Sequence, residues 1–203
     1  MQVDLAHVLF WMDAIRNSED KYRTLEGFWK GQIQSKEWLI QCLRPYIKDH
    51  VTIDIFGGWN GVLASLLFQS NLPITQIRNI DIDPKCSDIA YTMNKIEEIE
   101  QRFSHVVADM CNIESNADVV INTSCEHITN DQYNVWLKNI PTDSLIVVQS
   151  NNYQIEEHIN CMDSLEKFTS MSGIDPFFAG ELVLSKYTRY LIIGKKHVEK
   201  SKN

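Results

Sequence analysis

Residues 51–68 read VTIDIFGGWNGVLASLLF and carry the clearest indication of the fold expected for the chain. Its β-branched start, Val51–Phe56, is typical of a buried strand, and the apolar run Val62–Phe68 predicts a buried helix. Between them lie Gly57, Gly58 and Gly61. Because a backbone without Cβ atoms turns tightly and lets a ligand approach the following helix N-terminus, this unit predicts a binding site after the strand.

The same alternation of strands and helices continues toward the C-terminus. A second strand is predicted over Ile77–Ile82, and Asp83-Pro84 supplies an N-cap and a first helical proline for the helix that follows. Three further strands are expected at 104–108, 117–121 and 144–149, with a helix at 131–139 before the last of them. This rhythm predicts a parallel sheet covered on both faces by helices.

The last part of the chain breaks this rhythm. Glu181–Ser185 and Thr188–Gly194 are predicted strands with only Lys186-Tyr187 between them. Two residues are too few for a crossover between parallel strands, so we expect these two strands to pair antiparallel.

Residues 1–50 read as helical and are expected to form an N-terminal helical cap. The first helix shows one amphipathic stripe, formed by Leu5, Val8, Leu9, Met12 and Ile15. A second helix is expected to be capped by Ser35 and to kink or end near Pro45. After this cap we expect one domain over 51–195 and a basic tail over 196–203.

The charge is acidic and unevenly placed. The 203 residues carry 19 Lys+Arg against 27 Asp+Glu, a net charge of −8. The segment from Lys195 to the end contributes +3, so residues 1–194 carry −11. Such a body attracts a phosphate backbone little, which disfavours general nucleic-acid binding but leaves a local basic groove for a particular RNA open.

Cysteine usage and hydropathy indicate the compartment. The five cysteines contain no C-x-x-C pair, so reduced thiols are expected. The longest apolar runs, such as Val8–Met12, are far shorter than the roughly 20 residues that cross a membrane. We therefore expect a cytoplasmic protein without membrane association. The sequence does not determine the oligomeric state.

An acid lies twenty residues beyond the glycine loop. Asp81 ends the second predicted strand, where a carboxylate can accept both hydroxyls of a ribose, so the sequence favours an adenosine-type cofactor. The alternative is an ordinary glycine loop, with Asp81 or Asp83 capping the next helix. A dinucleotide fingerprint G-x-G-x-x-G fails because Phe56 stands at its first glycine, and no Walker-type loop is present.

Four segments and the terminal hairpin occur in a recognisable order. Asp54–Gly61 loosely follows the pattern D-x-G-x-G-x-G with one residue more, and Asp81 follows the second strand. Asp109-Met110 follows the third strand, and Asp118–Ile128 contains Cys125-Glu126-His127 after the fourth. Together with the ending RYLIIGK at 189–195, these residues resemble the class I S-adenosylmethionine-dependent methyltransferases over about residues 50–195.

The resemblance implies an α/β three-layer sandwich with a mostly parallel seven-stranded sheet and an antiparallel terminal hairpin. It implies S-adenosylmethionine as cofactor, bound by Gly57, Gly58, Trp59, Asn60, Gly61, Asp81, Ile82, Asp109, Met110 and Asn122. The implied activity is methyl transfer to an unidentified, small polar acceptor, with a nucleic acid less expected. The alternatives are an RNA or protein acceptor on the same fold, or a catalytically silent module that binds other proteins.

Candidate catalytic and acceptor-binding residues follow the fourth and fifth strands. His127 is the expected general base, because its ordinary pKa is near neutrality, with Glu126 beside it. Ser124, Asn151, Asn152 and Tyr153 are the expected substrate contacts. The alternative is that these residues only pack, cap a helix or form a loop.

A metal site is disfavoured by the sequence. His158, Cys161, Cys125 and His127 include soft donors, but His158-x-x-Cys161 lacks a second compact pair of ligands. No metal ligand is therefore predicted.

Overall fold

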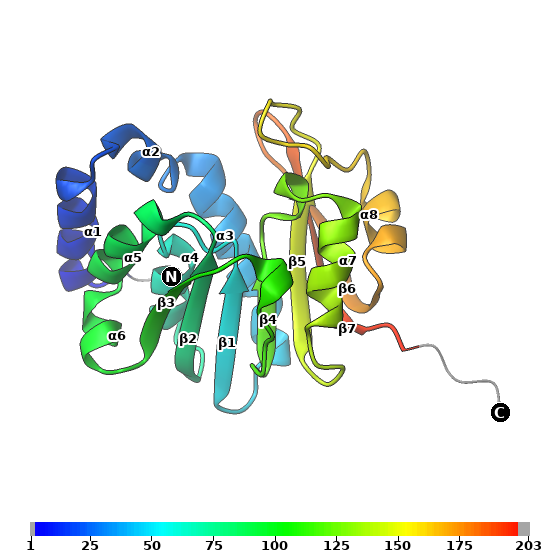
Figure 1. Cartoon of the computed structure of the whole chain (residues 1–203), viewed down its shortest axis with the longest axis horizontal. Helices are drawn as coiled ribbons and strands as arrows, with labels where there is room; N and C mark the ends of the chain where they lie inside the picture. The colour runs from blue at the N-terminus through cyan, green and yellow to red at the C-terminus, as the bar shows by residue number, and fades with distance from the viewer. Residues whose placement is uncertain (1–2, 199–203) are drawn as a thin grey trace. The chain divides into compact units, whose positions relative to one another are not determined.

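The computed structural model describes residues 3–198. They form two compact units, the first ending at Met110 and the second beginning at Cys111 (Figure 1). Residues 199–203 of the expected basic tail lie outside the described residues. Within the described part of the chain, every helix is too short or too polar to traverse a bilayer.

The first unit contains three parallel strands. They are β1 (Val51–Phe56), β2 (Ile74–Asp81) and β3 (Phe103–Val107), in the order β3-β2-β1. Ile55 pairs with Asn79 and Ile80 with Val106, so the strands end at the same edge. This edge carries the glycine loop after β1 and the acid that ends β2.

Helices of the first unit cover this sheet. Their bounds are α1 (Leu5–Asn17), α2 (Lys21–Glu26), α3 (Lys30–Leu43), η1 (Arg44–Tyr46), α4 (Val62–Phe68), η2 (Pro84–Cys86), α5 (Ser87–Met93) and α6 (Lys95–Ile99). Helix α4 packs on β2, α5 on β3, and α1 on α5 (Figure 1). Asp83 accepts a hydrogen bond from the Lys85 amide with Pro84 next to it, which confirms the predicted cap.

The apolar stripe of α1 does not face the core. Leu5, Leu9 and Met12 are exposed by 70%, 59% and 59%, whereas His7 is buried. The reason is polar: His7 Nε2 lies 2.8 Å from Glu97 Oε1, and Trp11 Nε1 donates to Ser65 Oγ at 2.9 Å. These two contacts turn the face of α1 that carries His7 and Trp11 toward α6 and α4.

The second predicted helix has the wrong start and the right end. Helix α3 begins at Lys30, so Ser35 lies buried inside it instead of capping it. The helix ends at Leu43, and Pro45 lies in the short η1 turn that follows. A proline at this place cannot continue the hydrogen bonds of an α-helix, which is why the helix stops there.

The second unit contains four strands in the order β4-β5-β7-β6. Its elements are η3 (Met110–Asn112), which begins at the last residue of the first unit, β4 (Val119–Asn122), η4 (Cys125–His127), α7 (Asn130–Lys138), β5 (Leu145–Asn151), α8 (Leu165–Met171), β6 (Ile174–Val183) and β7 (Thr188–Lys196). Strands β4 and β5 are parallel, whereas β7 is antiparallel to both β5 and β6.

The fold class predicted from the sequence is therefore confirmed: a mostly parallel seven-stranded sheet with a terminal antiparallel hairpin and flanking helices. Each core is apolar and close to the strands. Ile53, Ile55 and Ile80 are fully or almost fully buried in the first unit, as are Val148 and Ile192 in the second. Two features were not expected, namely helix α8 and the early start of β6 at Ile174.

Candidate functional site

The glycine loop has a backbone that only small or strained residues can follow. Gly57 and Gly61 have φ angles of 61° and 74°, and Trp59 between them has a φ of 47°. A non-glycine residue at positive φ is uncommon, and for a bulky side chain it indicates strain that the surroundings hold in place. The loop is thus fixed in shape by its neighbours.

Asp81 is one of the groups that hold the loop. Its Oδ2 accepts a hydrogen bond from the Trp59 amide at 2.8 Å, and its Oδ1 accepts one from the Asp83 amide at 3.0 Å. A carboxylate has about four acceptor positions, so each oxygen retains a lone pair for a further donor. Asp81 therefore joins the β1 loop to the end of β2 and can still accept hydroxyl groups.

The buried side chain of Asn79, in β2, supports the loop through a hydrogen bond. Asn79 is fully buried, and its Nδ2 donates to the Trp59 carbonyl at 3.1 Å and lies 3.0 Å from His105 Nδ1. Since the Asn79 amide can only donate there, His105 Nδ1 accepts and the ring is neutral. Burial lowers the pKa of His105, and Asp81 only partly offsets this effect. Neither residue was predicted as part of the site, because a single Asn or His inside a strand belongs to no recognisable motif.

Asp54, the first acid of the glycine motif, has a charged partner in its own sheet. Arg78 Nε donates to Asp54 Oδ1 at 2.9 Å, and the second guanidinium nitrogen reaches the other carboxylate oxygen. Asp54 is buried and lies opposite Arg78 in the register of β1 and β2. The bidentate pair neutralises Asp54, so it acts as a structural support for the strand end.

Helix α2 also reaches this loop. Arg23 Nη2 lies 2.7 Å from Asp83 Oδ2, and its guanidinium carbon lies 6.0 Å from the centre of the Trp59 ring. Arg23 of α2 thus contacts both Trp59 in the loop and Asp83 just after β2. Next to it, Asn60 is 2% exposed, and its Nδ2 has no hydrogen-bond partner among the described residues. This buried donor is available to a bound molecule or water.

The remaining predicted cofactor contacts lie in loops after the strands. Ile82, directly after β2, is exposed by 68%. Asp109 and Met110 follow β3 and are half-buried. Asn122 ends β4 in the second unit, where it is fully buried and its Oδ1 accepts from the Ser124 amide at 2.9 Å.

In the second unit, Glu126 is the centre of a buried polar cluster. Its Oε1 accepts hydrogen bonds from Asn151 Nδ2 at 2.6 Å and from Arg189 Nη1. Glu126 and Arg189 are 2% and 5% exposed. Burial disfavours the Arg189 cation, but Glu126 and other neighbours outweigh this and raise its pKa. The structure thus brings the predicted residues Glu126 and Asn151 together and adds Arg189.

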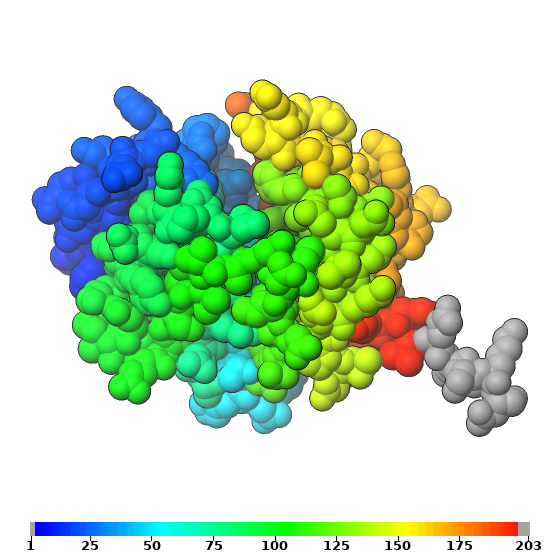
Figure 2. All heavy atoms as spheres, viewed as in Figure 1, coloured from blue at the N-terminus to red at the C-terminus, as the bar shows by residue number. Residues whose placement is uncertain are grey.

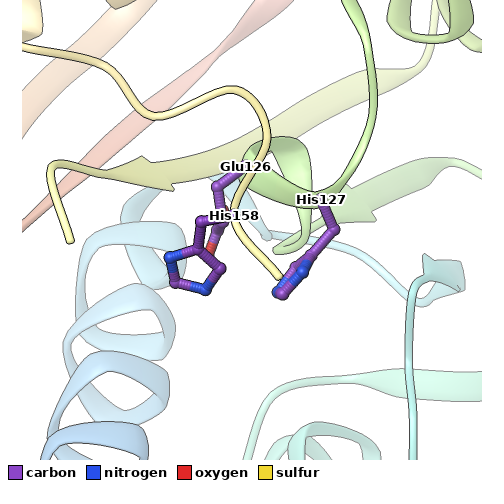
Figure 3. Close-up of side chains that lie close together, drawn as sticks. All are labelled: Glu126, His127 and His158. Atoms are coloured by element: carbon purple, nitrogen blue, oxygen red, sulfur yellow. The ribbon is translucent and has the colours of Figure 1, made fainter. Parts of the chain in front are cut away.

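The two histidines near Glu126 have matching hydrogen bonds. His127 Nδ1 lies 3.0 Å from the Glu157 carbonyl oxygen, and His158 Nδ1 lies 2.6 Å from that of Tyr153. A carbonyl only accepts, so Nδ1 carries a proton in both rings, and Nε2 of a neutral ring then has its lone pair available. The ring centres lie 4.6 Å apart at an angle of 83° (Figure 3).

The residues predicted to contact the acceptor differ in whether they lie together. Asn151 Oδ1 accepts from the Tyr153 amide at 2.8 Å, so these two lie together. The Tyr153 ring stacks on Tyr187 at 5.3 Å between centres. Asn152 is exposed, and its Oδ1 accepts from the Thr188 amide at 2.8 Å, which is a structural contact to β7.

Comparison with known proteins identifies the fold. Magnesium protoporphyrin IX methyltransferase from Synechocystis PCC 6803, with bound SAM, superposes with a TM-score of 0.65 at 12% identity, over 95% of this chain and 92% of that one. The N-methyltransferase NodS from Bradyrhizobium japonicum WM9 gives 0.64 at 9% identity, over 81% and 96%. The small RNA methyltransferase HEN1 gives 0.66 at 17%, over 84% of this chain and 26% of that one.

No family model matches the chain, and the search of curated proteins found no match. At these identities the structural similarity establishes the fold alone: the chain has the class I methyltransferase fold.

Proposed function

Because the chain has the class I methyltransferase fold, we propose that it transfers a methyl group from S-adenosylmethionine to an acceptor. Methyl transfer from a sulfonium is an in-line displacement: the acceptor's lone pair forms the new bond while the sulfur takes the electrons of the old one. The protein mainly supplies proximity and orientation for this step. The residues that bind and orient the cofactor are therefore central to this activity.

The observation that carries the proposal is the arrangement of Asp81 and the glycine loop. The carboxylate is held by the Trp59 and Asp83 amides at 2.8 and 3.0 Å and retains acceptor capacity for two hydroxyls. Asp81 lies at the carboxyl end of β2, beside the glycine loop that follows the neighbouring strand β1. The carboxyl ends of parallel strands are where α/β folds bind nucleotides. A ribose is the group that this arrangement fits.

We assign the neighbouring residues on the same basis. Gly57, Gly58 and Gly61 would lie beside the methionine part, and the free amide of Asn60 would donate to its carboxylate. Ile82 and Met110 would bracket the adenine, with Asp109 contacting its amino group. The exposure of Ile82, a large apolar side chain at a strand end, is consistent with a surface that a flat ring covers. Trp59 and Asn122 stay predictions.

The acceptor is proposed to be small and polar, in keeping with the net charge of −8. Ser124, Asn151, Asn152 and Tyr153 stay its predicted contacts, and His127 its predicted base. Glu126 is engaged as the counter-charge of Arg189, so its role in this proposal is to position its neighbours.

Calorimetric titration with S-adenosylmethionine and S-adenosylhomocysteine tests the proposal. A hydrogen bond to a charged group contributes about 1.5–3 kcal/mol, so Asp81→Asn is expected to weaken binding about 10–100-fold. The matched control is Asp49→Asn, an exposed acid in the same unit, and it is expected to bind like the wild type.

Two results would contradict the proposal. No heat on titrating the folded wild type with either compound would favour the silent interaction module. An unchanged affinity of Asp81→Asn would remove the ribose assignment. If the cofactor binds, transfer of a labelled methyl group to small amines and hydroxy compounds, compared with transfer to RNA and protein, distinguishes the three classes of acceptor.

A further inference from the structure

Glu126, His127 and His158 gather three potential ligand atoms in the second unit. One carboxylate oxygen and one nitrogen of each ring all lie within 4.8 Å of one another. Figure 3 shows the three side chains converging from the η4 turn and from the loop after β5. His127 and His158 were weighed as metal donors from the sequence and disfavoured, and only the fold brings these residues and Glu126, up to 32 positions apart, together.

The protonation of both rings is the one that a metal ligand needs. Each Nδ1 donates to a backbone carbonyl, at 3.0 Å for His127 and 2.6 Å for His158. Histidines that bind metal through Nε2 almost always donate the other ring N–H to such an acceptor, which fixes the tautomer and the ring direction. Two rings with the same arrangement side by side indicate a pair of nitrogen ligands.

Glu126 has one oxygen that the protein does not use. Oε1 accepts from Asn151 and Arg189, whereas Oε2 is buried and has no hydrogen-bond partner among the described residues. A buried carboxylate oxygen without a partner is unfavourable, and such an atom needs an explanation. A cation between this oxygen and the two rings provides one.

The nearby thiols are poor candidates for the same site. Neither thiol belongs to the group of gathered ligand atoms among the described residues. Cys125 Sγ donates to the Asn122 carbonyl at 3.8 Å, and Cys161 Sγ donates to the Tyr153 carbonyl at 3.1 Å. The donor set is therefore two imidazole nitrogens and one carboxylate oxygen.

We propose that Glu126, His127 and His158 bind one divalent transition-metal ion of the Zn²⁺ or Co²⁺ class. Imidazole and carboxylate together suit such ions, whereas Mg²⁺ prefers oxygen ligands. Around tetrahedral Zn²⁺, ligand distances of about 2.0–2.2 Å place any two ligands roughly 3.3–3.6 Å apart, so a group whose atoms lie within 4.8 Å must contract by up to about 1.5 Å. His127 is exposed and His158 half-buried, which leaves the rings room to turn.

The site leaves coordination positions open. Three protein ligands are one fewer than a closed tetrahedral site needs, so water or a ligand oxygen completes the shell. The loop after β5, yellow in Figure 2, lies at the surface of the second unit. The Arg189 cation beside Glu126 opposes a second positive charge, so affinity depends mainly on the two ring nitrogens.

This inference does not depend on methyl transfer, because it concerns ion binding by the second unit alone. A metal on Nε2 of His127 occupies the lone pair that a general base uses, so the ring cannot serve both purposes at once.

The test uses the full chain, freed of metal by dialysis against a chelator, with Zn²⁺ added in competition with a chromophoric chelator. We expect binding of one ion per chain. His127→Gln and His158→Gln are each expected to weaken binding by at least about 100-fold, because loss of even an outer-shell partner costs roughly 10–100-fold. The matched control is His50→Gln, an exposed histidine of the first unit, with wild-type affinity expected. The histidines are substituted because Glu126→Gln would leave Arg189 without its buried counter-charge.

A second measurement does not rely on the variants folding. In the wild type, Co²⁺ is expected to broaden the ring NMR signals of His127 and His158 and to leave that of His50 unchanged. The inference is overturned if the wild type binds no Zn²⁺, if both variants keep wild-type affinity, or if Co²⁺ broadens His50 as strongly as the pair. The methyltransferase proposal is tested separately, by calorimetric titration with S-adenosylmethionine.

Discussion

Gly58 is the position of the glycine loop where the structure predicts the largest effect of a single methyl group. A Cβ at Gly58 would lie 2.0 Å from Asn79 Oδ1 and 2.5 Å from its Cγ. The φ angle of Gly58 is not in the left-handed region, so the backbone itself accepts alanine. The effect of Gly58→Ala is therefore a collision with one named side chain.

The loss of folding free energy follows from the contacts that Asn79 makes. It is fully buried, and displacing it disturbs its hydrogen bonds to the Trp59 carbonyl and to His105. Overpacking costs about 1–3 kcal/mol, and each hydrogen bond about 1 kcal/mol. We therefore expect Gly58→Ala to lower the free energy of unfolding by about 3–5 kcal/mol, against a total of about 5–15 kcal/mol for a typical protein.

A double-mutant cycle measured by urea unfolding isolates the collision. Asn79→Ala alone loses the two hydrogen bonds, but it also removes the atoms that the new methyl group meets. Adding Gly58→Ala to it should cost little more, so the two substitutions should couple by at least about 2 kcal/mol. Gly27→Ala is the control, because its Cβ meets nothing closer than 3.2 Å. If the two substitutions are additive within about 0.5 kcal/mol, the methyl group at position 58 does not collide with Asn79.

Three further outcomes are expected. His105 has a lowered pKa because it is buried, so the unfolded chain binds its proton more readily. The free energy of unfolding should therefore fall as pH drops below 6.5, and less so in His105→Gln, as urea midpoints on either side of that pH would show. Arg189→Met leaves Glu126 as an unpaired buried charge and should cost about 3–5 kcal/mol. Thermal unfolding should show part of this loss recovered by adding Glu126→Gln, and no recovery would contradict the pairing. Burial first, then nearby acids, raise the pKa of Cys86 to about 12, so mass spectrometry should find it unalkylated in the folded protein at neutral pH and alkylated after unfolding.

The strand order along the chain was predictable because local patterns carry it. β1 and α4 have the expected bounds, and the terminal antiparallel hairpin forms as predicted, although four residues lie between Val183 and Thr188 where two were expected. Strong β-branched runs, glycines and a capping proline act through nearby backbone and burial, so a short window of sequence is enough to predict them.

Other features depend on partners far away in the chain. The orientation of α1 follows from His7 meeting Glu97 and Trp11 meeting Ser65, and its apolar stripe points elsewhere. Arg189 meets Glu126 because β7 lies antiparallel to β5, opposite Asn151. A local sequence pattern does not predict which polar residues will form hydrogen bonds or ion pairs with residues far away in the chain.

The class of fold and the positions of the glycine loop and Asp81 could be predicted from the amino-acid sequence, since both follow from the order of strands and turns. The support of that loop by Asn79 and His105 became visible only in the folded chain. The same holds for the gathering of Glu126, His127 and His158. Hydrogen bonds and ligand geometry act over a few ångströms in space, whereas sequence patterns report neighbours along the chain.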